Sequence, residues 1–163
     1  MNGCRTPLMD GHVRGAFSGL TLQHKPAHLY RALIEGSALG LRWIVETLEA
    51  GGVPVREFVA TGGLPHHNPL LVQIYADVLG EPITVHPCKH GSALGAAILG
   101  TLAAGERASG FRSAEAAIRT MAEPRASVAA RRARVVKPSS KSREVYQRAY
   151  QEYLELAKFF ERN

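Results

Sequence analysis

Several features that would identify a function quickly are missing from this sequence of 163 residues. It has only two cysteines, Cys4 and Cys88, which are too few for a disulfide framework and whose spacing fits no metal-binding motif. No apolar run is long enough to span a bilayer, and the first residues, which include Arg5 and Asp10, do not read as a signal peptide. The sparse cysteine usage is typical of a protein of the reducing cytoplasm.

Two nucleotide-binding fingerprints are also missing, because the chain contains neither GxGxxG nor GxxxxGK[ST]. Aspartate is scarce: Asp10 and Asp77 are the only two. Seven histidines invite a metal interpretation, and His86 and His90 lie four residues apart. Pro87 between them argues against a helix that would bring both rings to one face. We therefore expect surface histidines and no metal site.

What is present is an ordinary globular composition, with 45% hydrophobic and 21% charged residues, in a chain of the usual length for one domain. The formal net charge is +6, and much of it lies between Arg125 and Arg143. A nucleic-acid site requires a folded basic face with stacking groups nearby, and this segment has few aromatic residues. We interpret residues 123–142, approximately, as a solvated basic connector and expect no nucleic-acid partner.

The apolar residues, glycines and prolines predict an alternation of strands and helices. We expect an irregular loop from Met1 to Arg14 and a strand from Gly15 to Leu22. The further predicted elements are a helix over 26–50, a strand over 58–61, a helix over 69–79, a strand over 83–86, helices over 92–104 and 113–121, and a terminal helix over about 143–161. This order predicts α/β layers with a largely parallel sheet. Three strands form a narrow sheet, which indicates that partner strands lie outside the chain.

Two of these helices carry apolar stripes that predict their buried faces. The stripe of the helix over 26–50 comprises Leu29, Leu33, Ser37, Leu41, Ile44 and Leu48. Beside it, Gly36 and Gly40 predict close packing against a neighbouring helix. The stripe of the terminal helix comprises Tyr146, Tyr150, Tyr153, Leu154, Ala157 and Phe160, and we expect it to serve packing and not ligand binding.

The stretch from Phe58 to Pro69 is central to the interpretation of the sequence, because it joins a predicted strand to a predicted helix. An apolar strand end is followed by Gly62 and Gly63, a short turn and then Asn68, a good N-cap before a proline at the first helical position. A strand that leads through glycines to a helix N-terminus is a common way to hold a nucleotide. By itself, a glycine pair after a strand is more often only a tight turn.

A longer pattern makes the interpretation specific. It consists of Gly15-Ala16-Phe17-Ser18-Gly19-Leu20, a spacer of seven residues, and His28-Leu29-Tyr30-Arg31-Ala32-Leu33-Ile34-Glu35. At every constrained position this resembles a signature of the FGGY carbohydrate kinases, the family of glycerol, xylulose, gluconate and ribulose kinases. Further segments resemble the family's preceding loop, adenosine motif and closing helix: residues 2–7, 61–78 and 92–97. The amino-acid sequence of residues 29–35 and 70–78 is most similar to that of the L-ribulokinase branch, among the pentulose kinases.

The resemblance implies a fold of the RNase-H-like kind found in actin, hexokinase and the Hsp70 ATPase. In this family two such domains face each other across a cleft, with ATP bound mainly by the second domain and the sugar mainly by the first. Residues 1–163 would be the C-terminal portion of the second domain, without its first two strands. An exposed sheet edge in such a fragment would favour self-association into a homo-oligomer.

The implied activity is transfer of the ATP γ-phosphate to a hydroxyl of a pentulose, with ATP and Mg²⁺ as cofactors. The family's catalytic aspartate and phosphate loops map onto no residue of this sequence. We therefore expect no catalytic residue here, Mg²⁺ ligands outside the chain, and no kinase activity from the chain alone. The alternative is a stand-alone, non-catalytic nucleotide-binding or interaction module that comes from a truncated gene.

The resemblance also indicates which residues meet ATP. The expected contacts and pocket wall are Gly62, Gly63, His67, Asn68, Ala93, Gly95 and Ala96. Gly62 and Gly63 would contact the ribose and α-phosphate through backbone groups, and His67 and Asn68 would lie at the adenine or its rim. Asn68 is explained equally well by its N-cap role, and close helix packing alone would also select the three small residues of the wall.

Overall fold

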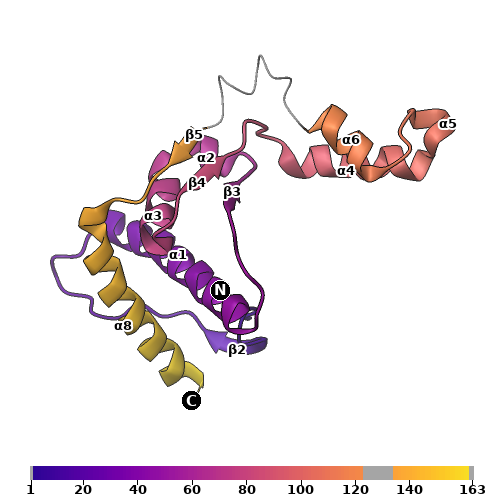
Figure 1. Cartoon of the computed structure of the whole chain (residues 1–163). Coiled ribbons are helices and arrows are strands. Elements are labelled where there is room, and N and C mark those ends of the chain that lie inside the picture. The colour runs from indigo at the N-terminus through magenta and orange to yellow at the C-terminus, as the bar shows by residue number, and fades with distance from the viewer. Residues whose placement is uncertain (1, 123–133, 162–163) are drawn as a thin grey trace. The chain divides into compact units, whose positions relative to one another are not determined.

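The computed structural model describes residues 2–122 and 134–161, which fall into two compact units. The first unit comprises Met1–Glu57, Gln73–Pro82 and Lys137–Asn163. The second unit comprises Phe58–Val72 and Ile83–Val136 (Figure 1). The alternation of helices with short strands confirms the expected α/β class.

The first unit begins with a β-hairpin, in which β1 (Asn2–Cys4) pairs antiparallel with β2 (Asp10–Arg14). The expectation of an irregular loop over residues 1–14 was therefore wrong. Turn-forming residues there close a hairpin instead of preventing one. Gly3, at φ +75°, allows the strands to approach, because a Cβ at this position would lie 2.6 Å from the carbonyl oxygen of Asp10.

The strand expected from Gly15 to Leu22 was also wrong, since these residues are irregular and exposed. Gly19 adopts φ +72°, a left-handed conformation that interrupts an extended strand.

The long helix α1 (Pro26–Ala50) has the expected bounds. At its start, the Lys25 N–H donates to Nδ1 of His28 at 3.1 Å. At its end the chain leaves through Gly51 and Gly52, and Gly52 adopts φ +81°.

The buried face of α1 is offset from the expected stripe. Leu33 and Leu48 are 46% and 42% exposed, and the buried positions are Ile34, Ala38 and Leu39. Spacing along one helix cannot reveal which neighbours it packs against, and α1 contacts both the terminal helix and Tyr75. At Gly40, a Cβ would lie 3.2 Å from the Tyr153 hydroxyl, which confirms close packing at this glycine, whereas Gly36 has no such neighbour within 4 Å.

The terminal helix α8 (Arg143–Glu161) buries Tyr146 and Tyr150, as expected of an aromatic packing stripe. Each hydroxyl donates to a carboxylate of α1: Tyr146 to Glu35 at 3.0 Å, and Tyr150 to Glu46 at 2.7 Å. The two helices are therefore joined by two equivalent tyrosine–glutamate contacts.

An arginine one turn earlier on α1 supports each of these carboxylates. Arg31 pairs with Glu35 and Arg42 with Glu46, both at 2.8 Å. The guanidinium carbon of Arg42 also lies 4.1 Å from the centre of the Tyr150 ring. Burial raises the pKa of Tyr150, and the hydrogen bond to Glu46 raises it further.

The helix α3 (Pro69–Leu79) has the expected bounds and ends at Gly80, which adopts φ +74°. Late in α3, the buried Asp77 accepts hydrogen bonds from Nε2 of Gln73 at 2.8 Å and from the Ser139 N–H at 2.7 Å. Gln73 also donates to the Lys137 carbonyl at 2.9 Å. These two side chains therefore fasten the segment that leads into α8.

The second unit contains a sheet in the order β3-β4-β5. β3 (Phe58–Ala60) and β4 (Ile83–Val85) are parallel, and β5 (Arg134–Val136) is antiparallel to β4. β5 corrects the expected connector over 123–142, because Val135 and Val136 form a strand through a partner far away in the sequence. Another correction is η1 (Ser140–Ser142). Residues 123–133 lie outside the described residues.

The other helices of the second unit are α2 (Leu64–His67), α4 (Gly91–Ala104), α5 (Glu106–Ser109) and α6 (Ala114–Met121). Figure 1 shows α6 folded back beside α4. Ser113 caps α6, with its hydroxyl oxygen 3.2 Å from the Ala116 N–H. Of the helices in the described part of the chain, none has the length and hydropathy needed to cross a membrane.

Candidate nucleotide-binding corner

The glycine pair lies at an open corner after β3. Gly62 adopts φ +87°, and a Cβ built there would meet no atom within 4 Å. Gly63 has helical angles, φ −72° and ψ −38°, and opens α2. Among the described residues, the N–H groups of Gly62, Gly63 and Leu64 have no hydrogen-bond acceptor. The corner thus presents bare α-carbons and three backbone donors.

Two predicted polar residues lie on or beside the one-turn helix α2, a helix that the sequence did not reveal. His67 is exposed, and its Cδ2 atom lies 3.7 Å from the position of a Cβ on Gly63. Asn68 accepts the Leu71 N–H on Oδ1 at 3.0 Å, which confirms its role as a cap of α3. The structure therefore brings His67 against Gly63 and commits the amide oxygen of Asn68 to the helix.

Side chains that sequence reasoning assigned no role fasten α2 to the sheet. His66 bonds to the His86 carbonyl oxygen through Nε2 at 2.9 Å. Arg134 donates to the carbonyl oxygen of Pro65, which is itself buried, at 3.2 Å. Since both contacts join residues far apart in the chain to a backbone oxygen, no motif or periodicity predicts them.

The first residue of α4 approaches the same corner. A Cβ on Gly91 would lie 3.4 Å from Cβ of Thr61 and 3.8 Å from the N atom of Gly62. The predicted wall residues follow within the next two turns and are all exposed: Ala93, Gly95 and Ala96. A Cβ on Gly95 would meet no atom within 4 Å, so the close packing that could have explained this glycine does not occur in the described structure.

The two aspartates of the chain make structural contacts. Asp77 is buried and holds Gln73 and Ser139. Asp10 accepts the His12 N–H at 2.7 Å, within β2. The chemistry that the corner offers is accordingly recognition by backbone donors, an imidazole and small residues, without a paired acid and base.

Two histidines beside the corner, His66 and His86, each use one ring nitrogen in a hydrogen bond. His86 accepts the Cys88 N–H on Nδ1 at 3.1 Å, and His66 uses Nε2 on a carbonyl group. Within residues 2–122 and 134–161, no group of three histidine, cysteine, aspartate or glutamate side chains is arranged to hold a metal ion.

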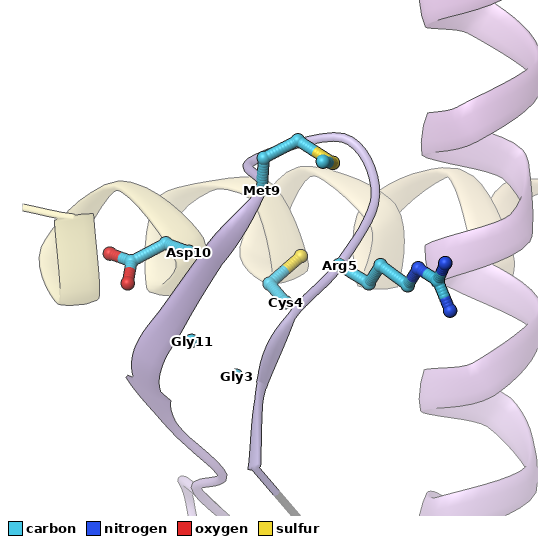
Figure 2. Close-up of a pocket in the computed structure, with 6 residues that line it drawn as sticks. All are labelled: Gly3, Cys4, Arg5, Met9, Asp10 and Gly11. Atoms are coloured by element: carbon cyan, nitrogen blue, oxygen red, sulfur yellow. The ribbon is translucent and has the colours of Figure 1, made fainter.

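A separate hollow of about 200 Å³ lies at the β1–β2 hairpin. Its lining residues are Gly3, Cys4, Arg5, Met9, Asp10 and Gly11. Figure 2 shows Arg5 and Asp10 pointing to opposite sides of the hairpin, so the two charges do not converge on the hollow. The Cys4 thiol is occupied with the Thr6 carbonyl at 3.4 Å. We assign this hollow no chemical role.

Comparison with known proteins agrees with the motifs. The family model for the C-terminal domain of the FGGY family of carbohydrate kinases matches residues 1–104. Ribulokinase from Halalkalibacterium halodurans is 40% identical over 161 residues, which cover 99% of this chain and 27% of that protein. Ribulokinase from Bacillus licheniformis is 38% identical over 159 residues, which cover 98% of this chain and 28% of that protein.

The structural match supports the same relationship. Xylulose kinase from Rhodospirillum rubrum superposes with a TM-score of 0.62 at 30% identity, over 90% of this chain and 28% of that one. This confirms the expected RNase-H-like fold class. The chain spans little more than a quarter of the length of these relatives. On the family match, the ribulokinase identities and the shared fold, this chain belongs to the FGGY family of carbohydrate kinases.

Proposed function

We propose that this chain is the adenosine-binding C-terminal part of an ATP-dependent sugar kinase that transfers the γ-phosphate of ATP to a hydroxyl of a pentulose. The observation that carries the proposal is the open corner at Gly62 and Gly63, in the segment that resembles the family's adenosine motif. The ribulokinase relatives favour ribulose, or a similar pentulose, as the acceptor.

The corner suits a nucleoside for physical reasons. Without Cβ atoms, Gly62 and Gly63 let a ribose and its α-phosphate approach the backbone, where unpaired N–H groups are available as donors. His67 offers a flat ring beside Gly63 for the adenine or its rim. Asn68, whose amide oxygen caps α3, would offer its amide N–H group there. Ala93, Gly95 and Ala96 would form a wall with low steric demand.

Phosphoryl transfer depends mainly on positioning and on electrostatic stabilisation of the phosphates. In this proposal the chain supplies only the positioning of the nucleoside. Mg²⁺ would neutralise phosphate charge, and we place its ligands in another part of the kinase. In support, the described residues contain no group of three histidine, cysteine, aspartate or glutamate side chains arranged to hold a metal ion. We place the sugar, and the base that acts on its hydroxyl, in that other part too. The buried Asp77 is not available as a base, because it already accepts hydrogen bonds from Gln73 and Ser139. Free Cys4 and Cys88 suit a cytoplasmic enzyme.

A chimera tests the proposal directly. Residues 1–163 replace the matching segment of the H. halodurans ribulokinase, to which they are 40% identical. We expect the chimera to bind ATP in calorimetry and to phosphorylate ribulose, and the 163-residue chain alone to bind ATP without turnover. Turnover by the chain alone would contradict the assignment of catalysis to the rest of the kinase. A chimera that binds ATP but does not turn over would favour the non-catalytic module, and one that does not bind ATP would remove the adenosine assignment.

A further inference from the structure

The helix α2 is too short to hold its own shape. It has a single turn, Leu64–His67, and its N-cap residue Gly63 makes no side-chain hydrogen bond to the helix. An isolated turn of helix is unstable in water, because fixing its backbone costs more than its few hydrogen bonds return. The conformation of the Gly62–Gly63 corner must therefore depend on contacts from outside α2.

His66 provides the most specific of these contacts. Its Nε2 atom lies 2.9 Å from the His86 carbonyl oxygen. A carbonyl oxygen only accepts hydrogen bonds, so Nε2 carries the proton and donates. The acceptor is well fixed in turn, since the His86 N–H continues the β3–β4 ladder to the Ala60 carbonyl at 2.9 Å. Through this bond, α2 is anchored to the end of β4.

Two further contacts lie beside the corner, but neither fixes the His66 side of α2. Arg134 holds the Pro65 carbonyl oxygen at 3.2 Å, from β5. The first residue of α4, Gly91, lies against Thr61. His66 is the one side chain of α2 with a hydrogen bond to another element in the described residues.

We propose that His66 is a positioning residue for nucleotide binding: its ring N–H anchors α2 to the end of β4, and thereby keeps the Gly62–Gly63 corner open and His67 beside Gly63. His66 itself does not touch the nucleotide. This inference rests on the proposed function, because it assumes that the corner receives the nucleoside.

Three substitutions at one position separate the hydrogen bond from the bulk of the ring. His66→Leu keeps an apolar side chain and removes the donor. His66→Gln places an amide N–H where Nε2 lies, whereas the shorter His66→Asn reaches only the position of Nδ1. The exposed His12, in the first unit, provides the control His12→Leu.

The experiment is an ATP titration of the full 163-residue chain and each variant by calorimetry, together with thermal unfolding and hydrogen exchange. We expect His66→Leu and His66→Asn to raise the ATP Kd by about tenfold, His66→Gln to remain within about twofold of the wild type, and His12→Leu to have no effect. In His66→Leu, the amides of His67 and Asn68, which bond to Gly63 and Leu64 in α2, should exchange faster. A purely structural role would instead lower the thermal midpoint and exchange protection throughout the second unit.

The outcomes separate the two proposals. If the wild-type chain and the chimera both fail to bind ATP, the proposed function and this inference fall together. If the wild type binds ATP and His66→Leu binds it equally well, or if α2 exchanges no faster, the positioning role of His66 is wrong while the proposed function stands. Failure of His66→Gln to restore binding in a folded chain would likewise overturn the role of the N–H.

Discussion

Gly63→Ala is the sharpest test of the nucleotide site, because the folded chain should tolerate it while a bound nucleotide should not. Gly63 has φ −72° and ψ −38°, which alanine adopts without strain. The new methyl group would meet only Cδ2 of His67, at 3.7 Å, an ordinary van der Waals distance. Replacing glycine at such a position reduces the freedom of the unfolded chain, so we expect the free energy of unfolding to change by less than about 1 kcal/mol.

The same methyl group would occupy the space through which the ribose and α-phosphate approach the backbone. A ligand that is pushed away loses its hydrogen bonds to the N–H groups of the corner, since these weaken steeply with distance and angle. We expect the ATP Kd to rise by at least about tenfold, equivalent to about 1.4 kcal/mol. Calorimetry of the chain and of the chimera measures the Kd, and thermal unfolding verifies the fold.

Two other glycines serve as comparisons for Gly63→Ala. Gly62→Ala is less informative, because φ +87° is a left-handed conformation that costs a side chain about 1–2 kcal/mol, so stability and binding would change together. Gly36→Ala, in α1, adds a methyl group with no atom within 4 Å and should leave ATP binding unchanged. A folded Gly63→Ala variant whose Kd stays within about twofold of the wild type would refute the proposed contact.

Three further predictions follow from individual contacts. Gly95 lies inside α4, and a Cβ there would have no neighbour within 4 Å. Gly95→Ala should therefore raise the free energy of unfolding by about 0.5–1 kcal/mol and weaken ATP binding. A higher thermal midpoint with an unchanged Kd would exclude Gly95 from the pocket wall. Burial raises the pKa of Tyr150, so the folded chain retains a proton that the unfolded chain loses above about pH 10. The urea midpoint should therefore fall as the pH rises beyond about 10, and it should fall less in Tyr150→Phe. A midpoint that is constant to about pH 11 would contradict this prediction. Asp77→Ala should lower the free energy of unfolding in urea by about 1–3 kcal/mol, because it leaves the Ser139 N–H unpaired. The kcat of the folded chimera should remain unchanged. A loss of kcat of about tenfold would assign Asp77 a part in the reaction.

Among the described residues, the five longer helices could be predicted because their limits are encoded locally, whereas the one-turn helices α2 and α5 could not. Pro26 opens α1 and a glycine pair closes it, Asn68 caps α3, and Ser113 caps α6. Each of these signals acts within one helical turn, so the residue order is sufficient to locate it. The glycine corner was located for the same reason, as a local strand–turn–helix sequence.

The elements that could not be predicted depend on contacts distant in the sequence. β5 is only three residues long and becomes a strand because β4 pairs with it across about 50 residues of chain. The anchors of α2 are of the same kind, since His66 and its acceptor are 20 residues apart, and Arg134 and Pro65 are 69 apart. A histidine or arginine that bonds to a backbone oxygen leaves no pattern in its own neighbourhood. The residues proposed to face the nucleotide could therefore be named from the local sequence, whereas the residues that hold α2 in place could not.

The glycines of the chain show where the fold itself fails to explain the sequence. At Gly3 a side chain would collide with the facing strand, and at Gly40 it would press on the Tyr153 hydroxyl, so packing accounts for both. At Gly63, the N-cap of α2, and at Gly95, inside α4, the folded chain has room for alanine. In a helix interior, as at Gly95, alanine is favoured by about 0.5–1 kcal/mol. Retaining glycine at position 95 therefore costs stability that no described contact returns. Gly36, inside α1, is equally open, so an open glycine does not by itself identify a ligand site. The alanine variants at Gly63 and Gly95 therefore test function through comparison with the matched control Gly36→Ala.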